Sequence, residues 1–188
     1  IDLNAGQSEG FIDVAQNPAG LVLNAAGTRL FVSHGGANSD PAIAPLTVID
    51  TQSRTVIDTL SVGSNGVNRL AINPIDGTLY TNNAIGGTLV AIDPVSGDIS
   101  QSVDVSTASD LSTQILDIGV APDGQFVYYT VSRISSTLDV SGIPTIGFVG
   151  GLGILDANTF EQVDEIVVGE ITANLGISPD GSTAYISG

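Results

Sequence analysis

Short apolar runs alternate with polar turns along the whole chain, and the first of two recurring patterns centres on a glycine. An apolar run of a few residues leads into a turn that ends on Gly, and a second apolar run follows directly. Runs this short, bounded by turn residues, predict β-strands, and Asp-Gly turns predict antiparallel hairpins. The four copies of this pattern begin at Leu21–Gly27, Leu70–Gly77, Ile118–Gly124 and Leu175–Gly181.

The second pattern centres on an aspartate. A short apolar strand closes on Asp, a polar turn follows, and a longer strand of alternating polar and apolar residues comes next. An Asp in this position accepts hydrogen bonds from backbone amides of the turn, so we assign these residues to turn capping rather than to catalysis or metal binding. The copies run from Asp2 to Val14, from Asp50 to Val62, from Asp93 to Val105 and from Asp156 to Val168.

The two patterns alternate strictly, so each repeating unit holds four short strands. Gly27, Gly77, Gly124 and Gly181 are 50, 47 and 57 residues apart. Repeats of about 45 residues with four strands each are typical of β-propellers. We therefore predict an all-β fold of four-stranded antiparallel blades in a single propeller segment, 1–188. It comprises a half blade at 1–16, blades at about 17–63, 64–106 and 107–169, and a half blade at 170–188.

Two stretches carry a resemblance to a known family. Residues Val48–Gly63 and Gly176–Gly188 resemble the YVTN-type β-propeller repeat, and the resemblance covers essentially the whole chain. The name-giving tetrapeptide departs from that pattern, although an aromatic residue opens every copy, and we expect this residue to pack between blades. The tetrapeptides here are Phe31-Val-Ser-His34, Tyr80-Thr-Asn-Asn83, Tyr128-Tyr-Thr-Val131 and Tyr185-Ile-Ser-Gly188.

The resemblance implies a fold without selecting an activity. Similar propellers occur in archaeal and bacterial surface proteins, in periplasmic binding proteins, in lactonase-like enzymes and in the haem d1 domain of nitrite reductases. Propellers of this family commonly close with seven blades. We therefore expect an open arc of a larger ring, of about seven blades, rather than a closed ring of four. Because the open ends of such an arc would expose apolar blade faces that repeat proteins normally cover, neighbouring sequence is expected on both sides.

The composition argues against several partners. The net charge is −16, from 20 acidic residues against 4 basic ones. Such a surface repels a polyanion, and the four basic residues are too scattered to follow a phosphate backbone, so we expect no nucleic-acid partner. No apolar run approaches the roughly 18 residues that a membrane span needs, so we expect no membrane insertion. Because Cys is absent, the chain has no disulfide, thiolate metal site or thiol nucleophile.

Loop lengths locate the face on which a ligand or partner is expected. The longest connections join the second and third strands of a unit, at Ser33–Pro45 and Ser132–Gly151. In a propeller these connections emerge on the same face as those between blades, around the central channel. The candidate ligand-binding residues near this face are His34, Asn68, Arg69, Asn82, Asn83 and Arg133.

Each candidate leaves two interpretations open. His34, the chain's single histidine, is either a general base or a metal or haem ligand, or it has a surface or turn role. Arg69 and the Asn residues near it either hold a carboxylate or sugar, or they pair with acids and satisfy turn backbones. We predict no catalytic residue, no metal ligand and no cofactor, with Ca²⁺ held by clustered Asp carboxylates as the weaker alternative.

The sequence favours an extracellular, cell-surface or periplasmic propeller module that acts as a structural or interaction scaffold. Its partners are expected to be proteins or neighbouring modules of the same chain. The absence of Lys and the acidity favour this interpretation, since they point to a solvated surface rather than to a site. The alternative is a periplasmic ligand-binding propeller, lactonase-like or associated with an oxidoreductase, with a site at the channel mouth.

Overall fold

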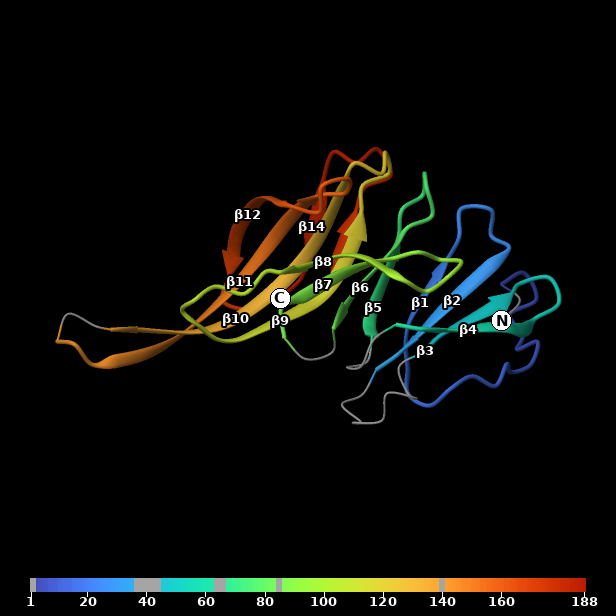
Figure 1. Ribbon diagram of the computed structural model, residues 1–188, viewed down its shortest axis with the longest axis horizontal. Coiled ribbons are helices and arrows are strands. Elements are labelled where there is room, and N and C mark those ends of the chain that lie inside the picture. The colour runs from blue at the N-terminus through green and yellow to red at the C-terminus, as the bar shows by residue number, and fades with distance from the viewer. Residues whose placement is uncertain (1–2, 36–44, 63–66, 84–85, 139–140) are drawn as a thin grey trace.

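The chain forms antiparallel β-sheets joined by short turns, and these are arranged as part of a propeller (Figure 1). The computed structural model describes residues 3–35, 45–62, 67–83, 86–138 and 141–188. Three sheets have four strands each and a fourth sheet has two, and the described residues contain no helix. It follows that no helix in this part of the chain is long and apolar enough to cross a membrane. The predicted all-β class and its four-stranded antiparallel blades are confirmed.

Every four-stranded sheet pairs its strands in chain order, which is the topology of a propeller blade. Blade I consists of β1 (Pro18–Leu23), β2 (Arg29–His34), β3 (Pro45–Asp50) and β4 (Thr55–Ser61). Blade II consists of β5 (Val67–Ile72), β6 (Leu79–Asn83), β7 (Thr88–Ile92) and β8 (Ile99–Asp104). Blade III consists of β9 (Asp110–Val120), β10 (Phe126–Leu138), β11 (Pro144–Asp156) and β12 (Gln162–Gly169). The half blade IV consists of β13 (Leu175–Ile177) and β14 (Ala184–Ile186).

The first strand of each blade lies innermost. β1 contacts β5, β5 contacts β9, and β9 contacts β13, so these strands converge as the inner strands of a propeller do. Figure 1 shows blades I, II and III side by side in chain order, with the N-terminus beside blade I. We call the side of a blade that faces the preceding blade its front face, and the side that faces the following blade its back face.

Both predicted turn types are confirmed. Gly27, Gly77, Gly124 and Gly181 all adopt a positive φ, between 68° and 82°, as tight hairpins between first and second strands require. In the second turn type the aspartate accepts backbone hydrogen bonds: Asp93 Oδ1 accepts from the N–H of Val95 at 2.7 Å and of Ser96 at 2.9 Å. Asp50 and Asp156 cap their turns in the same way.

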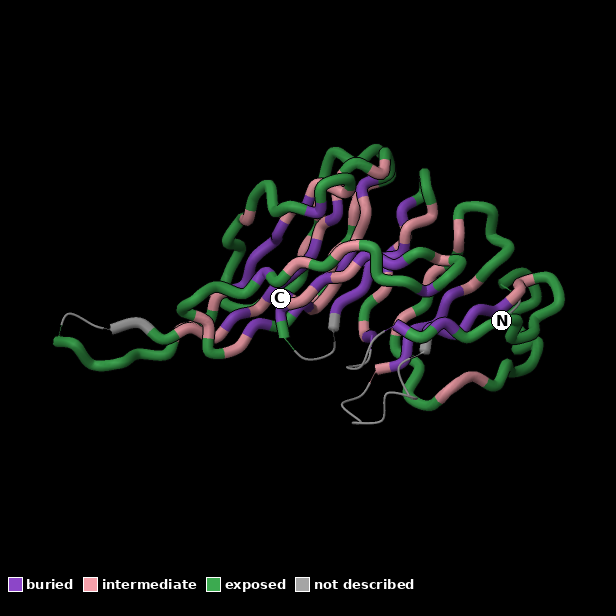
Figure 2. The backbone as a smooth tube through the Cα atoms, viewed as in Figure 1, coloured by how far each residue is buried: buried purple, intermediate pink, exposed green. Residues whose placement is uncertain are grey.

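Apolar side chains fill the spaces between blades, and the aromatic residue of the repeat lies there. Phe31 projects from the back face of blade I into a cluster with Leu79 and Ile92 of blade II, and all three are buried. Tyr80 does the same between blades II and III, where its ring stacks on Phe160 with the centroids 5.9 Å apart. Figure 2 shows the buried positions running along the strands and the exposed ones at the turns.

A side chain two residues after the aromatic position joins each blade to the next by a hydrogen bond. In blades I to III this side chain projects from the back face and donates to a backbone carbonyl on, or just before, the innermost strand of the following blade. The bonds are Ser33 Oγ to Asn68 O at 3.0 Å, Asn82 Nδ2 to Ile115 O at 3.1 Å and Thr130 Oγ1 to Ala173 O at 2.9 Å. The repeat thus combines one aromatic side chain and one hydrogen-bond donor at each blade interface.

In half blade IV the aromatic residue of the repeat is not covered by any described segment. Tyr128 of blade III is half-buried beside the half blade, whereas Tyr185 on the back face of β14 is 65% exposed. No described segment packs on that face. The expected packing between blades is therefore confirmed for Phe31 and Tyr80, and Tyr185 lies where such packing would continue.

The N-terminal segment departs from the regular pattern. Residues 3–16 form turns, a single bridge at Gln7 and extended chain, and the strand expected to end at Val14 is absent. The segment lies over the front face of blade I, where Glu9 pairs with Arg54 at 2.6 Å. A strand needs a ladder partner, and a segment that crosses a sheet face does not meet a free edge.

Two aromatic residues at the same repeat position give a matched test of blade packing. Tyr80→Ala removes a buried ring between blades II and III and should lower the opening free energy of both by about 3–5 kcal/mol. Tyr185→Ala removes an exposed ring and should change the stability of a dilute sample by less than about 0.5 kcal/mol. Native-state hydrogen exchange measures both changes, and equal effects at the two positions would contradict the described packing.

The capping aspartates predict a pH-dependent contribution to stability. The backbone N–H groups of Ser96 and Val95 lower the pKa of Asp93 from its ordinary value of 3.8. The carboxylate therefore stabilises the fold above the unfolded pKa, and this contribution disappears as the pH falls through the lowered value.

Asp93→Asn should accordingly melt at a lower temperature than the wild-type chain at about pH 7, and the difference should shrink as the pH falls below the ordinary value of 3.8. Asp98→Asn removes the same charge from a residue that bonds to this turn through its backbone, and it should show no such dependence. A difference in melting temperature between Asp93→Asn and wild type that persists at the lower pH would show that the cap does not act through its charge.

Candidate functional site

The second long connection, Ser132–Gly151, is built almost entirely of strand. β10 and β11 have 13 residues each and pair without interruption from Phe126↔Asp156 to Leu138↔Pro144. β9 accompanies them only as far as the pair Ser135↔Asp110, so the tip of the hairpin extends alone. Figures 1 and 2 show this hairpin projecting away from the blades, with exposed residues towards its tip. The other long connection, Ser33–Pro45, falls for the most part outside the described residues.

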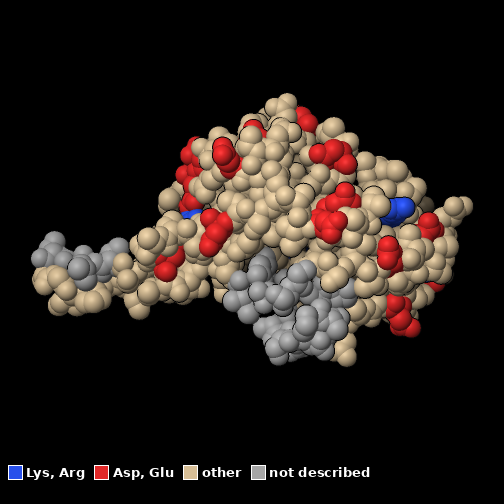
Figure 3. Space-filling model, in the orientation of Figure 1, with Lys and Arg blue, Asp and Glu red and all other residues tan. Residues whose placement is uncertain are grey.

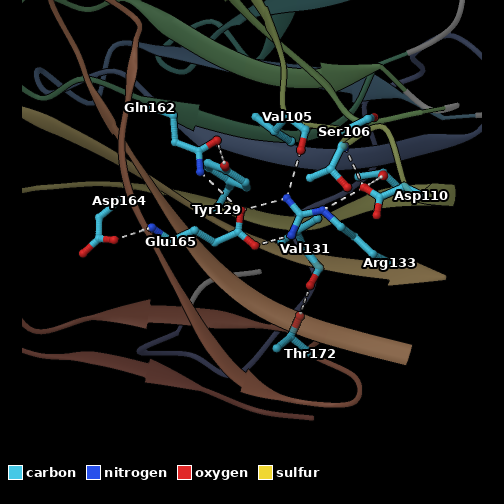
Figure 4. A network of polar contacts seen from close by, with 12 residues as sticks. Val105, Ser106, Asp110, Tyr129, Val131, Arg133, Gln162, Asp164, Glu165 and Thr172 are labelled. Atoms are coloured by element: carbon cyan, nitrogen blue, oxygen red, sulfur yellow. Dashed lines mark hydrogen bonds and ion pairs between the residues drawn. The ribbon is translucent and has the colours of Figure 1, made fainter. Parts of the chain in front are cut away.

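Arg133 lies at the base of this hairpin in a buried polar network (Figure 4). Its guanidinium forms a bidentate contact with Glu165, in which Nη2 lies 2.8 Å from Oε2 and Nη1 donates to Oε1. Nη2 also donates to the backbone carbonyl of Val105 at 2.9 Å, which ties blade III to the segment that leaves blade II. On the other side, Nε lies 3.2 Å from Asp110 Oδ2 as an ion pair without hydrogen-bond geometry.

Tyr129 and Gln162 extend the network. The Tyr129 hydroxyl donates to Gln162 Oε1 at 3.2 Å, and Gln162 Nε2 donates to Glu165 Oε2 at 3.2 Å. The Tyr129 ring lies against Gly153 on the neighbouring strand, where an added Cβ would stand 2.0 Å from a ring atom. The glycine is therefore required by the close approach of this ring.

The pKa values of Asp110 and Arg133 are both shifted so as to favour their ionised forms. Burial alone would raise the pKa of Asp110, but hydrogen bonds from Thr107 and Thr113 and the charge of Arg133 outweigh it, so the pKa is lowered. Burial would lower the pKa of Arg133, and the bonds and charges of Glu165 and Asp110 reverse this and raise it. Burial, together with the Glu165 carboxylate, raises the pKa of Tyr129, which stays a neutral donor.

A polar hollow opens beside Asp110. It has a volume of about 410 Å³ and is formed by the start of β9 and by the connections that leave β6 and β8. Hydroxyl and amide groups dominate its lining, which consists of Gly86, Ser106, Asp110, Leu111, Ser112, Thr113 and Gln114. A neutral polyhydroxy compound fits this chemistry better than an anion, because Asp110 supplies the one charge among these residues.

His34 is placed inside blade I. It is 1% exposed, its Nδ1 lies 3.0 Å from Gln16 O, and its Nε2 lies 2.9 Å from Thr47 Oγ1. Both ring nitrogens are occupied within the protein, and the contacts join the N-terminal segment to the blade. The geometry gives His34 a buried structural role on β2, which is neither the ligand role nor the surface or turn role expected from the sequence.

The Asn and Arg candidates of blade II are spread over several environments. Asn82 is buried, accepting from the Arg69 backbone N–H at 2.9 Å and donating to blade III. Asn68 accepts the bond from Ser33 through its backbone carbonyl, while the Arg69 side chain is exposed. Asn83 pairs with Val67 at the end of β6, and its side chain is outside the described part. Asn68 and Asn82 thus connect blades, and neither they nor Arg69 line the hollow beside Asp110.

Sequence reasoning found Arg133 but not the residues that surround it. Asp110 and Glu165 lie 23 and 32 positions away in the chain, and only the register of β9 to β12 brings them together. One signal was present, since Arg133 is the single basic residue of blade III and a buried cation requires acidic partners. Because alternate residues of a strand face the same side of a sheet, the pattern of β12 would have indicated Glu165 as an acidic partner of Arg133.

The surface carries acidic side chains without a basic patch on the face shown in Figure 3. Acidic groups are spread over this face, and basic groups appear at two separate places. Among the described residues, no group of three or more His, Asp or Glu side chains is arranged to hold a metal ion.

Comparisons with known proteins identify the fold. The chain resembles a putative 6-phosphogluconolactonase from Bacteroides uniformis with a TM-score of 0.62 and 14% identity, over 90% of this chain and 46% of that one. It resembles the Cps50 (Swd1) β-propeller domain from Myceliophteria thermophila with a TM-score of 0.56 and 12% identity, over 95% and 64%. It resembles Kuenenia stuttgartiensis hydrazine synthase with a TM-score of 0.51 and 16% identity, over 96% and 58%. No family model and no curated protein matches the chain.

These likenesses support a propeller fold and nothing finer. At 12–16% identity they carry no activity over to this chain, and they do not test the YVTN-type assignment, which stays a prediction. The chain spans less than two thirds of the length of each of these structures.

The Arg133 network can be tested for its structural weight. Arg133→Met leaves the carboxylates of Asp110 and Glu165 without their cation and should destabilise blade III by about 3–5 kcal/mol. Arg133→Lys should recover only part of the lost stability, because an ammonium group cannot make the bidentate contact with Glu165. Arg69→Met is the control, since that side chain is exposed. If hydrogen exchange in blade III responded equally to Arg133→Met and Arg69→Met, the network would not be stabilising.

Proposed function

We propose that the chain is an extracellular or cell-surface β-propeller module that serves as a protein-interaction scaffold and binds its partner through the tip of the β10–β11 hairpin. The observation that carries the proposal is the projection of this hairpin with apolar side chains on its surface. Ile146 is 66% exposed and Phe148 is 51% exposed, although both lie on strands. Exposed apolar side chains gathered on one element mark contact surfaces.

The hairpin face has a defined chemistry. Ile134 pairs with Phe148, and Ser136 pairs with Ile146, so their side chains share one face of the ribbon. Ile143 beside the turn is 60% exposed. Hydroxyl groups of the same strands border these residues, and no charged residue follows Arg133 on β10. Such a surface suits an apolar cleft in a protein partner.

The partner class follows from charge. A net charge of −16 repels nucleic acids and anionic lipid surfaces, which leaves neutral or basic protein surfaces and neighbouring modules as partners. The extracellular or cell-surface location rests on the composition and on the family resemblance.

A ligand-binding or lactonase-like role at the channel mouth is the alternative. The polar hollow beside Asp110 and the lactonase neighbour favour it. Two features support the scaffold instead. Asp110 is held by Arg133, Thr107 and Thr113, and the described lining of the hollow has no cation to receive a phosphorylated substrate.

Photo-crosslinking on intact cells of the source organism tests the proposal. A crosslinking amino acid at Ile146 should label one surface protein, whereas the same group at the exposed Val95 on a blade turn should not. With the labelled protein purified, Phe148→Ser should weaken its binding at least about tenfold, because central aromatic residues dominate interfaces. Phe11→Ser removes another exposed ring, away from the hairpin, and should leave the affinity unchanged.

Two outcomes would overturn the proposal. Equal labelling from Ile146 and Val95 would show that the hairpin has no specific partner. Resistance of the chain to protease added outside intact cells, with digestion after lysis, would remove the cell-surface location while leaving the hairpin contact open to the binding measurement.

A further inference from the structure

The polar hollow beside Asp110 lies between blades II and III, away from both ends of the described arc. Its described lining comes from the connection that leaves β6, the connection from β8 to β9 and the start of β9. Blades II and III each have all four strands, so neither wall belongs to an incomplete blade. The volume of about 410 Å³ lies within the range of about 300–1,000 Å³ that small-molecule sites occupy.

Asp110 is the charged residue of this lining, and the two oxygens of its carboxylate differ in their contacts. The Asp110 side chain is only 5% exposed. The Thr107 N–H donates to Oδ2 at 2.8 Å, and the Thr113 hydroxyl donates to the same oxygen at 2.9 Å. Arg133 Nε also lies 3.2 Å from Oδ2. Because Oδ1 receives none of these bonds, it is the oxygen that can accept from a group in the hollow.

Hydrogen bonds within the protein hold the walls of the hollow in place. The Val105 N–H donates to Gly87 O at 2.8 Å, and the Asp110 N–H donates to Thr107 O at 3.0 Å. Gly87 also permits a close approach of the two connections, because an added Cβ there would stand 2.5 Å from Ser106 Oγ. Binding to walls that are already ordered costs less conformational entropy. The hollow is therefore pre-organised for a ligand.

The chemistry of the lining favours a neutral ligand with several hydroxyl groups. Ser and Gln side chains both donate and accept hydrogen bonds, as a ligand hydroxyl does, and the residues of these types are Ser106, Ser112 and Gln114. An anion would face the Asp110 carboxylate, and the described lining has no cation to hold it. A cation would meet a carboxylate that is already paired with Arg133.

We propose that this hollow is a binding site for a neutral sugar, in which Asp110 Oδ1 accepts hydrogen bonds from sugar hydroxyls. Ser106, Ser112 and Gln114 supply further polar contacts. The site binds the sugar without turnover, because glycoside hydrolysis uses a pair of carboxyl groups and Asp110 supplies the single one in the described lining. This binding function is separate from the contact of the β10–β11 hairpin with a protein, and neither proposal depends on the other.

NMR titration of the isotope-labelled full chain provides the first test, with glucose, galactose, mannose, N-acetylglucosamine, maltose and lactose as probes. At least one of these sugars should bind with a Kd of about 1–10 mM or tighter. The backbone amide signals of Ser106, Ser112 and Gln114 should shift, and that of Val95 on an exposed turn of blade II should not. If none of the sugars shifted the signals of the hollow at about 100 mM, the proposal would be wrong.

Charged probes distinguish the other classes of ligand. Inorganic phosphate and methylammonium, at the concentration used for the sugars, should leave the signals of the hollow unchanged. A larger shift with phosphate than with any sugar would identify an anion site, and a larger shift with methylammonium would identify a cation site. Either result would overturn the assignment to a neutral sugar.

Asp110→Asn and Glu165→Gln give a matched test of the carboxylate. Figure 4 shows the two carboxylates on opposite sides of Arg133, and only Asp110 lines the hollow. Asp110→Asn should weaken sugar binding at least about tenfold, because hydrogen bonds to a charged acceptor are about twice as strong as those to a neutral one. Glu165→Gln removes a charge from the same guanidinium and should change the affinity by less than about twofold.

The outcomes of this pair separate the hollow from the network beside it. An equal loss of sugar binding in both variants would show that the loss comes from the Arg133 network, and full binding in both would show that Asp110 does not contact the sugar. Both results would contradict the proposal. The amide signals report whether each variant is folded, and if Asp110→Asn fails to fold, the shifts in the wild-type chain decide the proposal by themselves.

Discussion

Packing of each blade on the next is the interaction on which the rest of the structure depends. A four-stranded sheet with apolar residues on both faces cannot bury them alone, so its stability comes from its neighbours. In the repeat, an aromatic ring and a nearby hydrogen-bond donor on the back face make the contacts to the following blade, as with Phe31 and Ser33. Three different residue types fill the donor position, since only the ability to donate to a backbone carbonyl is required.

Blade III adds an electrostatic connection to this scheme. Its long strands continue past the apolar layer, and at that level Arg133 joins Asp110, Glu165 and the Val105 carbonyl. A buried cation is tolerated there because two carboxylates and a carbonyl surround it. The network anchors the base of the hairpin and leaves its tip to carry apolar residues into solvent.

The sequence predicted those features that local chemistry determines. Gly77 and Asp93 specify their turns through positive φ and backbone capping, and both recur often enough to define the blades. The roles of His34 and Asn82 were not predictable in the same way, because a polar side chain at a strand end suits a ligand or a buried backbone group equally well. Only the register and the neighbouring blade decide between them. The continuation of β10 through Arg133 was not predictable either, because spacing alone does not distinguish a long hairpin from a loop between the second and third strands.

The packing of each blade on its neighbours also affects the order in which the blades unfold. Within the described residues, blade II is flanked by four-stranded blades on both sides, whereas blade I is partly covered on its front face by an irregular segment and blade IV has only two strands. Opening free energies in such an array follow the number of covered faces. Among the described blades, blade II is therefore expected to open last.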